Sequence, residues 1–203
     1  MNTKRLRVTL ISPRPTEEFV WSMSSYAFPH NVFLNHDLRH NPDLFDAIIT
    51  SVVVTGTPTN EGKNFHFCLS LVTSNESSVR FDPTPSYTDP VHPMRTNLVL
   101  EWKKVSIDSN TRDTDLFKVP VLRNDTAGVL CMQLFNDFKV NQYDFDDQGR
   151  GCRHWCASIF NILARLGVTE DVSLDFENWE NKQYQKFGDM FPMPRICGTF
   201  YTA

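Results

Sequence analysis

The sequence lacks the features that mark several large classes of protein. No stretch approaches the roughly 20 consecutive apolar residues of a membrane-spanning helix. The apolar run near the start is only about five residues long, which is too short for the apolar part of a signal peptide. There is no basic stripe and no acidic tail, and the net charge is −4. We therefore expect a cytoplasmic protein that neither spans a membrane nor binds nucleic acid.

The cysteines show neither a disulfide framework nor a zinc-binding pattern. There are five, an odd number, and no Cys-x-x-Cys pair is present. Cys152 and Cys156 are four residues apart, and on a helix His154 would point away from the face that these two cysteines share. We expect five free thiols, no bound metal and no cofactor.

What the chain does contain is enough for a hydrophobic core. It has 203 residues, of which 40% are hydrophobic, with 16 Phe and 4 Trp. This length and composition predict a single folded domain over residues 1–203, since no repeat, low-complexity tract or linker divides the chain. Residues 13–42 hold four prolines and three histidines without clean periodicity, and they predict a long irregular excursion with at most a helical turn.

Alternating and β-branched segments predict an antiparallel sheet. The expected strands cover residues 4–12, 48–55, 64–73, 78–82, 97–107, 116–122 and 196–201. Residues 64–73 and 78–82 are joined by a short polar turn, which predicts a hairpin. The remaining patterns predict loops over residues 56–62 and 83–96, and helices over residues 127–140, 152–166 and 177–190, with Asp43 capping a short helix that runs into Ala47. The fold class is therefore α+β.

The expected strand at residues 64–73 carries one histidine among apolar residues. Phe65 and Phe67 lie on one face with two leucines, and His66 lies on the other face with Cys68. A histidine on a strand projects from a rigid sheet in a defined direction, as a general base requires. A lone histidine on a strand is more often structural, so a second functional group is needed to support a catalytic role.

The second group is Cys152, at the start of the strongest helix pattern in the chain. Gly149 and Gly151 precede it and allow the backbone to turn tightly. The first turn of a helix offers free N–H groups and a partial positive charge, which stabilise a thiolate or an oxyanion. A cysteine at this position is more often a small buried residue. We expect Cys152 and His66 to form a catalytic pair, although the apolar face containing Phe67 points away from His66 and would itself cover the helix.

Several nearby residues are candidates for supporting roles. Asp82 and Asn64 are candidates for orienting His66, and Trp155 for shaping a substrate pocket. Arg80 and Arg153 are candidates for binding a carboxylate, but the sequence slightly favours two solvated side chains.

Two short motifs resemble those of known families. The order of a histidine strand (Asn64-Phe-His-Phe67), its hairpin partner, and a later helix that opens Gly151-Cys-Arg-His-Trp155 resembles the circularly permuted papain-like (NlpC/P60-type) proteins. The same motifs, with Ser77-Ser-Val-Arg80 and Gly198-Thr-Phe200, resemble more closely a group of uncharacterised fungal proteins over roughly residues 50–203. That group often has an adjacent Asn-His pair and a Trp, whereas here Phe65 separates Asn64 from His66 and Phe67 takes the place of the Trp.

The resemblance implies a permuted papain-like fold, with an antiparallel sheet packed against the cysteine-headed helix. It also implies a cysteine-dependent acyl-transfer enzyme, a hydrolase or an acyltransferase, that acts on a small-molecule substrate. Two alternatives stay open. One is a fungal cyclase or isomerase of secondary metabolism that uses His66 as an acid or base in an aromatic pocket. The other is a binding module on a scaffold without catalytic activity.

Overall fold

The computed structural model describes residues 27–59, 62–73, 77–104 and 113–202. The strands are β1 (Val32–Leu34), β2 (Ile49–Pro58), β3 (Phe65–Thr73), β4 (Ser77–Pro85), β5 (Thr96–Lys104), β6 (Phe117–Pro120), β7 (Tyr143–Asp144) and β8 (Thr199–Phe200). The α-helices are α1 (His36–His40), α2 (Ala127–Met132), α3 (Cys152–Arg165) and α4 (Ser173–Phe187). Two 3-10 helices (Pro42–Asp46 and Gly188–Met190) and one π-helical turn (Gln133–Asp137) complete the structure over these residues.

Six of the strands form one sheet in the order β1-β5-β4-β3-β2-β6. Neighbouring strands are antiparallel except β1 and β5, which are parallel. The two short strands β7 and β8 form a separate antiparallel pair. This mixture of a mostly antiparallel sheet with helices confirms the α+β class.

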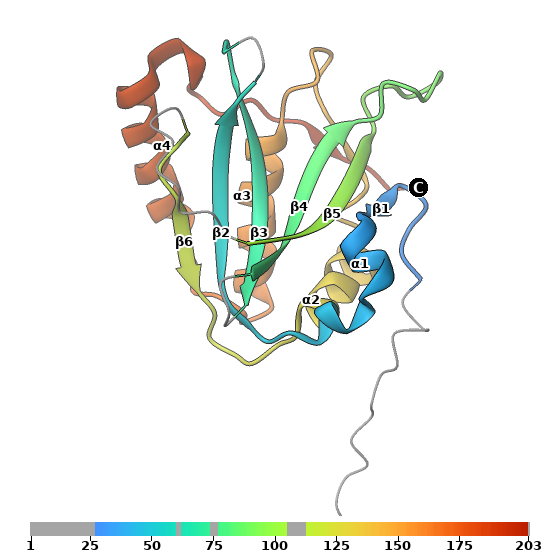
Figure 1. Cartoon of the computed structure of the whole chain (residues 1–203). Helices are drawn as coiled ribbons and strands as arrows, with labels where there is room; N and C mark the ends of the chain where they lie inside the picture. Colours follow the sequence, from blue (N-terminus) through green and yellow to red (C-terminus); the bar gives the residue numbers. More distant parts are fainter. Residues whose placement is uncertain (1–26, 60–61, 74–76, 105–112, 203) are drawn as a thin grey trace, which may run out of the picture.

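Helix α3 packs on one face of the sheet, against β3 and β4, and runs behind them in Figure 1. The face of β3 that meets the helix side carries Phe65, Phe67, Leu69 and Leu71, all of which are buried. Trp155 of α3 is fully buried and its ring centroid lies 6.3 Å from that of Phe81. The prediction that this apolar face covers the helix is therefore confirmed.

Strands β3 and β4 pair over only part of their length. Their ladder runs from Leu69 opposite Phe81 to Val72 opposite Ser78, although β3 begins at Phe65 and β4 continues to Pro85. Beyond the ladder β4 stays paired with β5, while the first residues of β3 stay paired with β2. The two strands diverge toward the upper end of Figure 1, and no strand of the described residues covers this edge of the first half of β3.

Helix α4 covers the β6 edge of the sheet. The Phe117 ring of β6 lies 4.9 Å from Phe176 and 5.8 Å from Trp179, centroid to centroid. Trp179 Nε1 donates a hydrogen bond to the backbone oxygen of Asp115, just before β6. These contacts fix α4 beside α3, and they place the buried face of α4 close to the start of α3.

Most of the elements expected from the sequence are present, with corrected limits. The strand expected at residues 4–12 lies outside the described residues. Strands β2 and β4 extend to Pro58 and Pro85, into the loops predicted on either side of the hairpin, because both continue their ladders. The helix expected to start at residue 177 begins at Ser173, because the Asp171 carboxylate accepts the Ser173 N–H and so caps the chain earlier.

Three further predictions were wrong in part. The described part of the expected irregular segment 13–42 contains β1 and α1, and Asn35 caps α1 by accepting from Leu38 N. The expected helix over residues 127–140 is α2 followed by a π-helical turn, so it ends at Asp137. The short helix expected from Asp43 is present as a 3-10 helix that begins at Pro42, with Asn41 rather than Asp43 at its cap. In the described residues, no helix has the length and apolar character needed to cross a membrane.

Candidate active site

The start of α3 is held in a conformation that only glycine adopts readily. Gly151 caps the helix at φ +138°, and Cys152 is the first helical residue. A Cβ at Gly151 would lie 2.7 Å from the Tyr143 hydroxyl. No side chain caps the helix here, so the N–H groups of its first turn have no side-chain partner at the cap. The Cys152 side chain is thus presented beside free backbone donors.

A buried tyrosine fixes this turn to two other parts of the chain. The Tyr143 hydroxyl donates to the backbone oxygen of Gly151 at 2.9 Å and accepts from the backbone N–H of Gly198 at 2.8 Å. It also contacts His154 Nδ1 at 3.0 Å, so His154 turns away from Cys152 toward Tyr143. Burial raises the pKa of Tyr143, which keeps this hydroxyl neutral. The helix start is therefore anchored to the β7–β8 pair.

The Cys152 sulfur occupies the uncovered edge of β3. The backbone N–H of Phe67 donates to Cys152 Sγ at 3.4 Å. This donor lies in the part of β3 where the ladder with β4 has ended. The sulfur therefore accepts a hydrogen bond from a donor that β4 leaves free. The first residue of α3 thus reaches the edge of β3 next to His66, although the body of the helix packs on the opposite face of the sheet.

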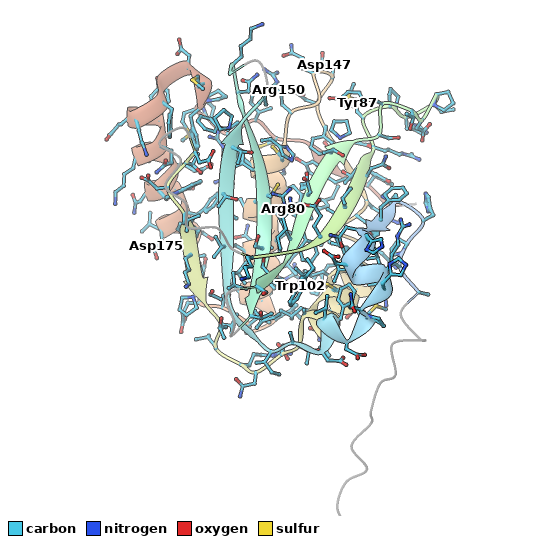
Figure 2. All side chains as sticks on the ribbon, viewed as in Figure 1. Arg80, Tyr87, Trp102, Asp147, Arg150 and Asp175 are labelled. Carbon is cyan, nitrogen blue, oxygen red and sulfur yellow. The ribbon has the colours of Figure 1, made fainter. Side chains whose placement is uncertain are left out.

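His66 is held by a carboxylate on the diverging strand. Its Nε2 lies 2.6 Å from Asp82 Oδ1, and the second oxygen, Oδ2, accepts from Arg80 Nη2 at 3.0 Å. Arg80 in turn pairs with Glu101 at 2.8 Å. Asp82 is therefore fixed on both sides, and it fixes one ring nitrogen of His66, which leaves Nδ1 for other partners. Arg80 is placed on the sheet near its middle in Figure 2, and it is engaged in ion pairs, contrary to the favoured solvated interpretation.

Hydrogen bonds favour a protonated His66. Burial disfavours the charged ring, but the hydrogen bond with Asp82 and the nearby Cys152 and Cys68 side chains outweigh it and raise the pKa of His66 well above 6.5. Burial likewise opposes ionisation of Asp82, yet the hydrogen bond and charge of His66 and the charge of Arg80 lower the pKa of that carboxyl. The structure joins His66 to Asp82 by a hydrogen bond, and the charge of the nearby Cys152 acts on the His66 ring; we call Cys152, His66 and Asp82 the triad.

The triad opens into a cleft of about 230 Å³. The cleft is lined in part by Cys152, His66 and Asn64, so Asn64 lies at the site but is not the hydrogen-bond partner shown for the His66 ring. Further walls come from the β4–β5 loop, the loop before α3 and the chain after α4, through Tyr87, Arg150 and Met190. The cleft is therefore formed by segments that are far apart in sequence.

A buried charge cluster lies behind Cys152. Arg153 pairs with Glu180 of α4 at 3.1 Å, and Arg195 also binds the Glu180 carboxylate. Glu180 is 1% exposed and Arg153 is 5% exposed. Burial lowers the pKa of Arg153 to about 10, which still leaves it charged at neutral pH. Arg153 is thus a buried structural cation that ties α3 to α4, and the prediction that it is solvated was wrong.

Trp155 does not lie at the cleft. It is fully buried, and its Nε1 donates to the backbone oxygen of Val140 at 2.8 Å. Its role is to seat α3 on the sheet. Sequence reasoning also missed Glu180, Arg195 and Tyr143, because nothing in their local patterns separates them from ordinary surface or core residues.

One cluster among the described residues has the spacing of a metal site. Ligand atoms of His66, Cys68 and Asp82 all lie within 4.8 Å of one another. Both oxygens of Asp82 already accept hydrogen bonds, one from His66 and one from Arg80. A metal ion would have to break the His66–Asp82 contact, so this donor set fits the hydrogen-bonded His66–Asp82 pair better than a cation site.

A second, larger cavity lies away from this chemistry. It has a volume of about 510 Å³ and is lined mainly by polar residues of β5, the segment before β1 and the chain before β7. Its lining includes none of the triad residues. Cavity size alone would therefore point to a different place from the perturbed titratable groups, which lie in and beside the smaller cleft.

Comparison with known protein families finds a match that covers most of the chain. Residues 49–201 match the family model described as a domain of unknown function (DUF7770). The chain belongs to this family. The matched residues of the DUF7770 domain contain the whole triad as well as Glu180 and Gly198, whereas β1 and α1 precede them. No curated protein and no solved structure matches the chain.

Proposed function

We propose that this DUF7770 protein is a cysteine-dependent acyl-transfer enzyme, a hydrolase or an acyltransferase. The observation that carries the proposal is the His66–Asp82 hydrogen bond near Cys152, with His66 and Cys152 lining one cleft and Cys152 at the start of a helix. Cys152 is the nucleophile, His66 is the acid and base, and Asp82 holds the ring. Asp82 is the orienting residue in preference to Asn64.

The chemistry follows from the placement of each group. The Cys152 thiolate attacks the carbonyl carbon of an ester, thioester or amide, and the carbonyl π electrons move to oxygen. Free N–H groups of the first turn of α3 are positioned to stabilise that oxyanion. Collapse of the intermediate expels the leaving group, which takes the proton from His66. Water or an acceptor alcohol or amine then gives a proton to His66, attacks the thioester and regenerates Cys152.

The architecture is compatible with a permuted papain-like fold, which we propose for this family. The histidine strand precedes the cysteine helix in the chain, and the helix start inserts where β3 and β4 diverge. This insertion brings a helix on one face of the sheet to a histidine on the other. Without this insertion, the alternation of faces along β3 would keep His66 on the side of the sheet away from Cys152.

Thiol reactivity tests the proposal. Iodoacetamide at limiting concentration should modify Cys152 faster than the exposed Cys197, with both sites quantified by peptide mass spectrometry at pH 6.5. The His66→Gln variant should lower the Cys152 rate by roughly 10²-fold or more, the usual contribution of an acid–base group. Cys197→Ala is the matched control, and it should leave the Cys152 rate unchanged.

Three results would redirect the assignment. Equal rates at Cys152 and Cys197, insensitive to His66→Gln, would contradict the nucleophile. If a substrate is found and turnover is lost in His66→Gln but kept in Cys152→Ala, the protein is a cyclase or isomerase that uses His66 alone. Saturable ligand binding that depends on neither Cys152 nor His66 would favour a binding module.

A further inference from the structure

We infer that the substrate group bound beside Cys152 is neutral and apolar or aromatic, and that Tyr87 selects it. This inference rests on the proposed acyl-transfer function and adds the substrate class and a specificity-determining residue to it. Tyr87 reaches the cleft from the β4–β5 loop, and Figure 2 shows it at the same end of the sheet as Arg150.

The first reason is that, among the described residues that line the cleft, no charged side chain lacks an ion-pair partner. Besides His66, the charged residues that line the cleft are Arg150 and Arg153. Arg150 binds Asp146 through two nitrogens, at 2.8 and 2.7 Å. Arg153 is paired with Glu180 and its guanidinium stacks over the Phe191 ring at 4.0 Å. Both guanidinium groups already have a carboxylate partner, so neither offers an unpaired charge to an ionic substrate group.

The second reason is the chemistry of the walls. Apolar and aromatic side chains surround the reacting sulfur on several sides. They are Phe65, Phe67, Tyr87, Met190, Pro192 and Ile196. Neutral polar residues, including Gln148, and the paired arginines complete the lining. A small cleft with both apolar and polar walls gains affinity by burying apolar surface of its ligand against the apolar part.

The third reason is how the chain presents Tyr87. Its ring is 64% exposed, unlike the other aromatic residues of the cleft. It has φ +51° and lies at the centre of a three-residue turn in which Thr88 N donates to Ser86 O at 2.6 Å. This positive-φ turn is rare and strained for a residue with a Cβ. Strain that is retained beside reacting groups indicates a positional requirement for the side chain.

Backbone hydrogen bonds hold the Tyr87 turn on one side, and the loop before α3 lies against Tyr87 on the other. Ser86 N and Tyr87 N donate to the backbone oxygens of Arg95 and Pro93. The Tyr87 hydroxyl lies so close to Gly149 that a Cβ there would be 2.4 Å from it. Tyr87 therefore spans from the β4–β5 loop to the loop that leads into Cys152, and it forms a wall that a bound acyl or leaving group must contact.

A series of chloroacetamides with one shared electrophile tests this inference. The probes are 2-chloroacetamide, its N-benzyl derivative, the anionic N-carboxymethyl derivative and the cationic N-(2-aminoethyl) derivative. Rates at Cys152 are divided by the rates of the same probes with glutathione. We expect the N-benzyl probe to exceed both charged probes by roughly 3- to 10-fold, the contribution of one aromatic contact.

Variants assign this preference to Tyr87. Tyr87→Asn keeps a residue that tolerates positive φ but removes the ring, and it should abolish the preference for the N-benzyl probe. Tyr87→Phe should restore it. Tyr184→Ala removes an exposed tyrosine of α4 that does not line the cleft, and it should leave the preference intact.

The outcomes separate this inference from the proposed function. Fast reaction of Cys152 with 2-chloroacetamide but equal or greater rates with a charged probe would overturn the inference and leave the nucleophile standing. A preference that persists in Tyr87→Asn would overturn the role of Tyr87. Slow reaction of Cys152 with every probe, no faster than Cys197, would instead count against the proposed function.

Discussion

His66 Nε2 and Asp82 Oδ1 lie 2.6 Å apart on strands that no longer pair with each other at this level. The contact bridges the space between the diverging strands β3 and β4, and the start of α3 places Cys152 beside it. Because β4 remains paired with β5 and β3 with β2, each residue keeps a rigid support while that space stays open. The predictions below follow from this construction.

The His66 ring should stay protonated at pH 8. Its pKa is raised above 6.5 mainly by the hydrogen bond to Asp82 and then by Cys152, against the opposing effect of burial. Because this pKa is raised, the His66 ring keeps its proton when the pH is increased above 6.5. Ring ¹⁵N shifts measured between pH 5 and 9 check this directly. We expect Asp82→Asn to lower the midpoint most and Cys152→Ala to lower it less; a wild-type midpoint near 6.5 would refute the prediction.

The buried carboxylate of Glu180 should be essential for stability. Glu180→Gln leaves Arg153 and Arg195 without their shared counterion, and breaking a buried ion pair typically costs about 3–5 kcal/mol. Urea unfolding measures the free energy of unfolding. Asp175→Asn, an exposed change on the same helix, is the control and should cost about 0.5 kcal/mol or less. Equal costs for the two variants would show that the cluster contributes no net stability.

Gly151→Ala should damage both the fold and the site. The residue has φ +138°, and its new Cβ would approach the Tyr143 hydroxyl to 2.7 Å. We expect a loss of about 2 kcal/mol or more in unfolding free energy, together with slower alkylation of Cys152. Gly62→Ala places a Cβ at φ +65° in open space, so it isolates the backbone effect from the clash. Similar losses in the two variants would argue against a steric role for Tyr143.

Thiol accessibility should divide the cysteines into two groups. Cys197 is exposed and Cys152 is half-buried, whereas Cys68, Cys131 and Cys156 are buried. Burial also raises the pKa of Cys131 and Cys156, which slows their reaction further. A disulfide-exchange reagent should therefore titrate two thiols rapidly in the native protein. It should titrate all five after denaturation without reductant, and a total of three or one would reveal a native disulfide.

The sequence predicted the parts of the fold in which apolar residues recur at a regular spacing. The alternation around His66 predicted β3 and its two faces, and the stripe that contains Trp155 predicted α3. It did not predict β1, because three residues among prolines and histidines form a strand only when they pair with β5. The limits of α2 were missed because a π-helical turn keeps much the same apolar spacing as an α-helix.

The sequence identified the residues of the candidate site better than it predicted how they are arranged in space. Cys152, His66 and Asp82 were candidates from their positions on a helix start and two strands. The divergence of β3 from β4 was not foreseeable, because the residues at Phe65–Cys68 have as strong a strand pattern as those that pair. The roles of Arg80 and Arg153 depend on partners in distant segments, Glu101 and Glu180, and no local pattern reveals such partners.

The hydrogen bond from Phe67 N–H to Cys152 Sγ makes this backbone amide a built-in reporter of the sulfur. A thiolate accepts the bond strongly, whereas a thioether or thioester sulfur accepts it weakly. The ¹H–¹⁵N resonance of one residue should therefore move when the sulfur is ionised, acylated or alkylated, and hydrogen–deuterium exchange at that amide should accelerate when the bond is lost. Occupancy of an intermediate can then be followed in the intact protein, without a chromogenic substrate and before any natural one is known.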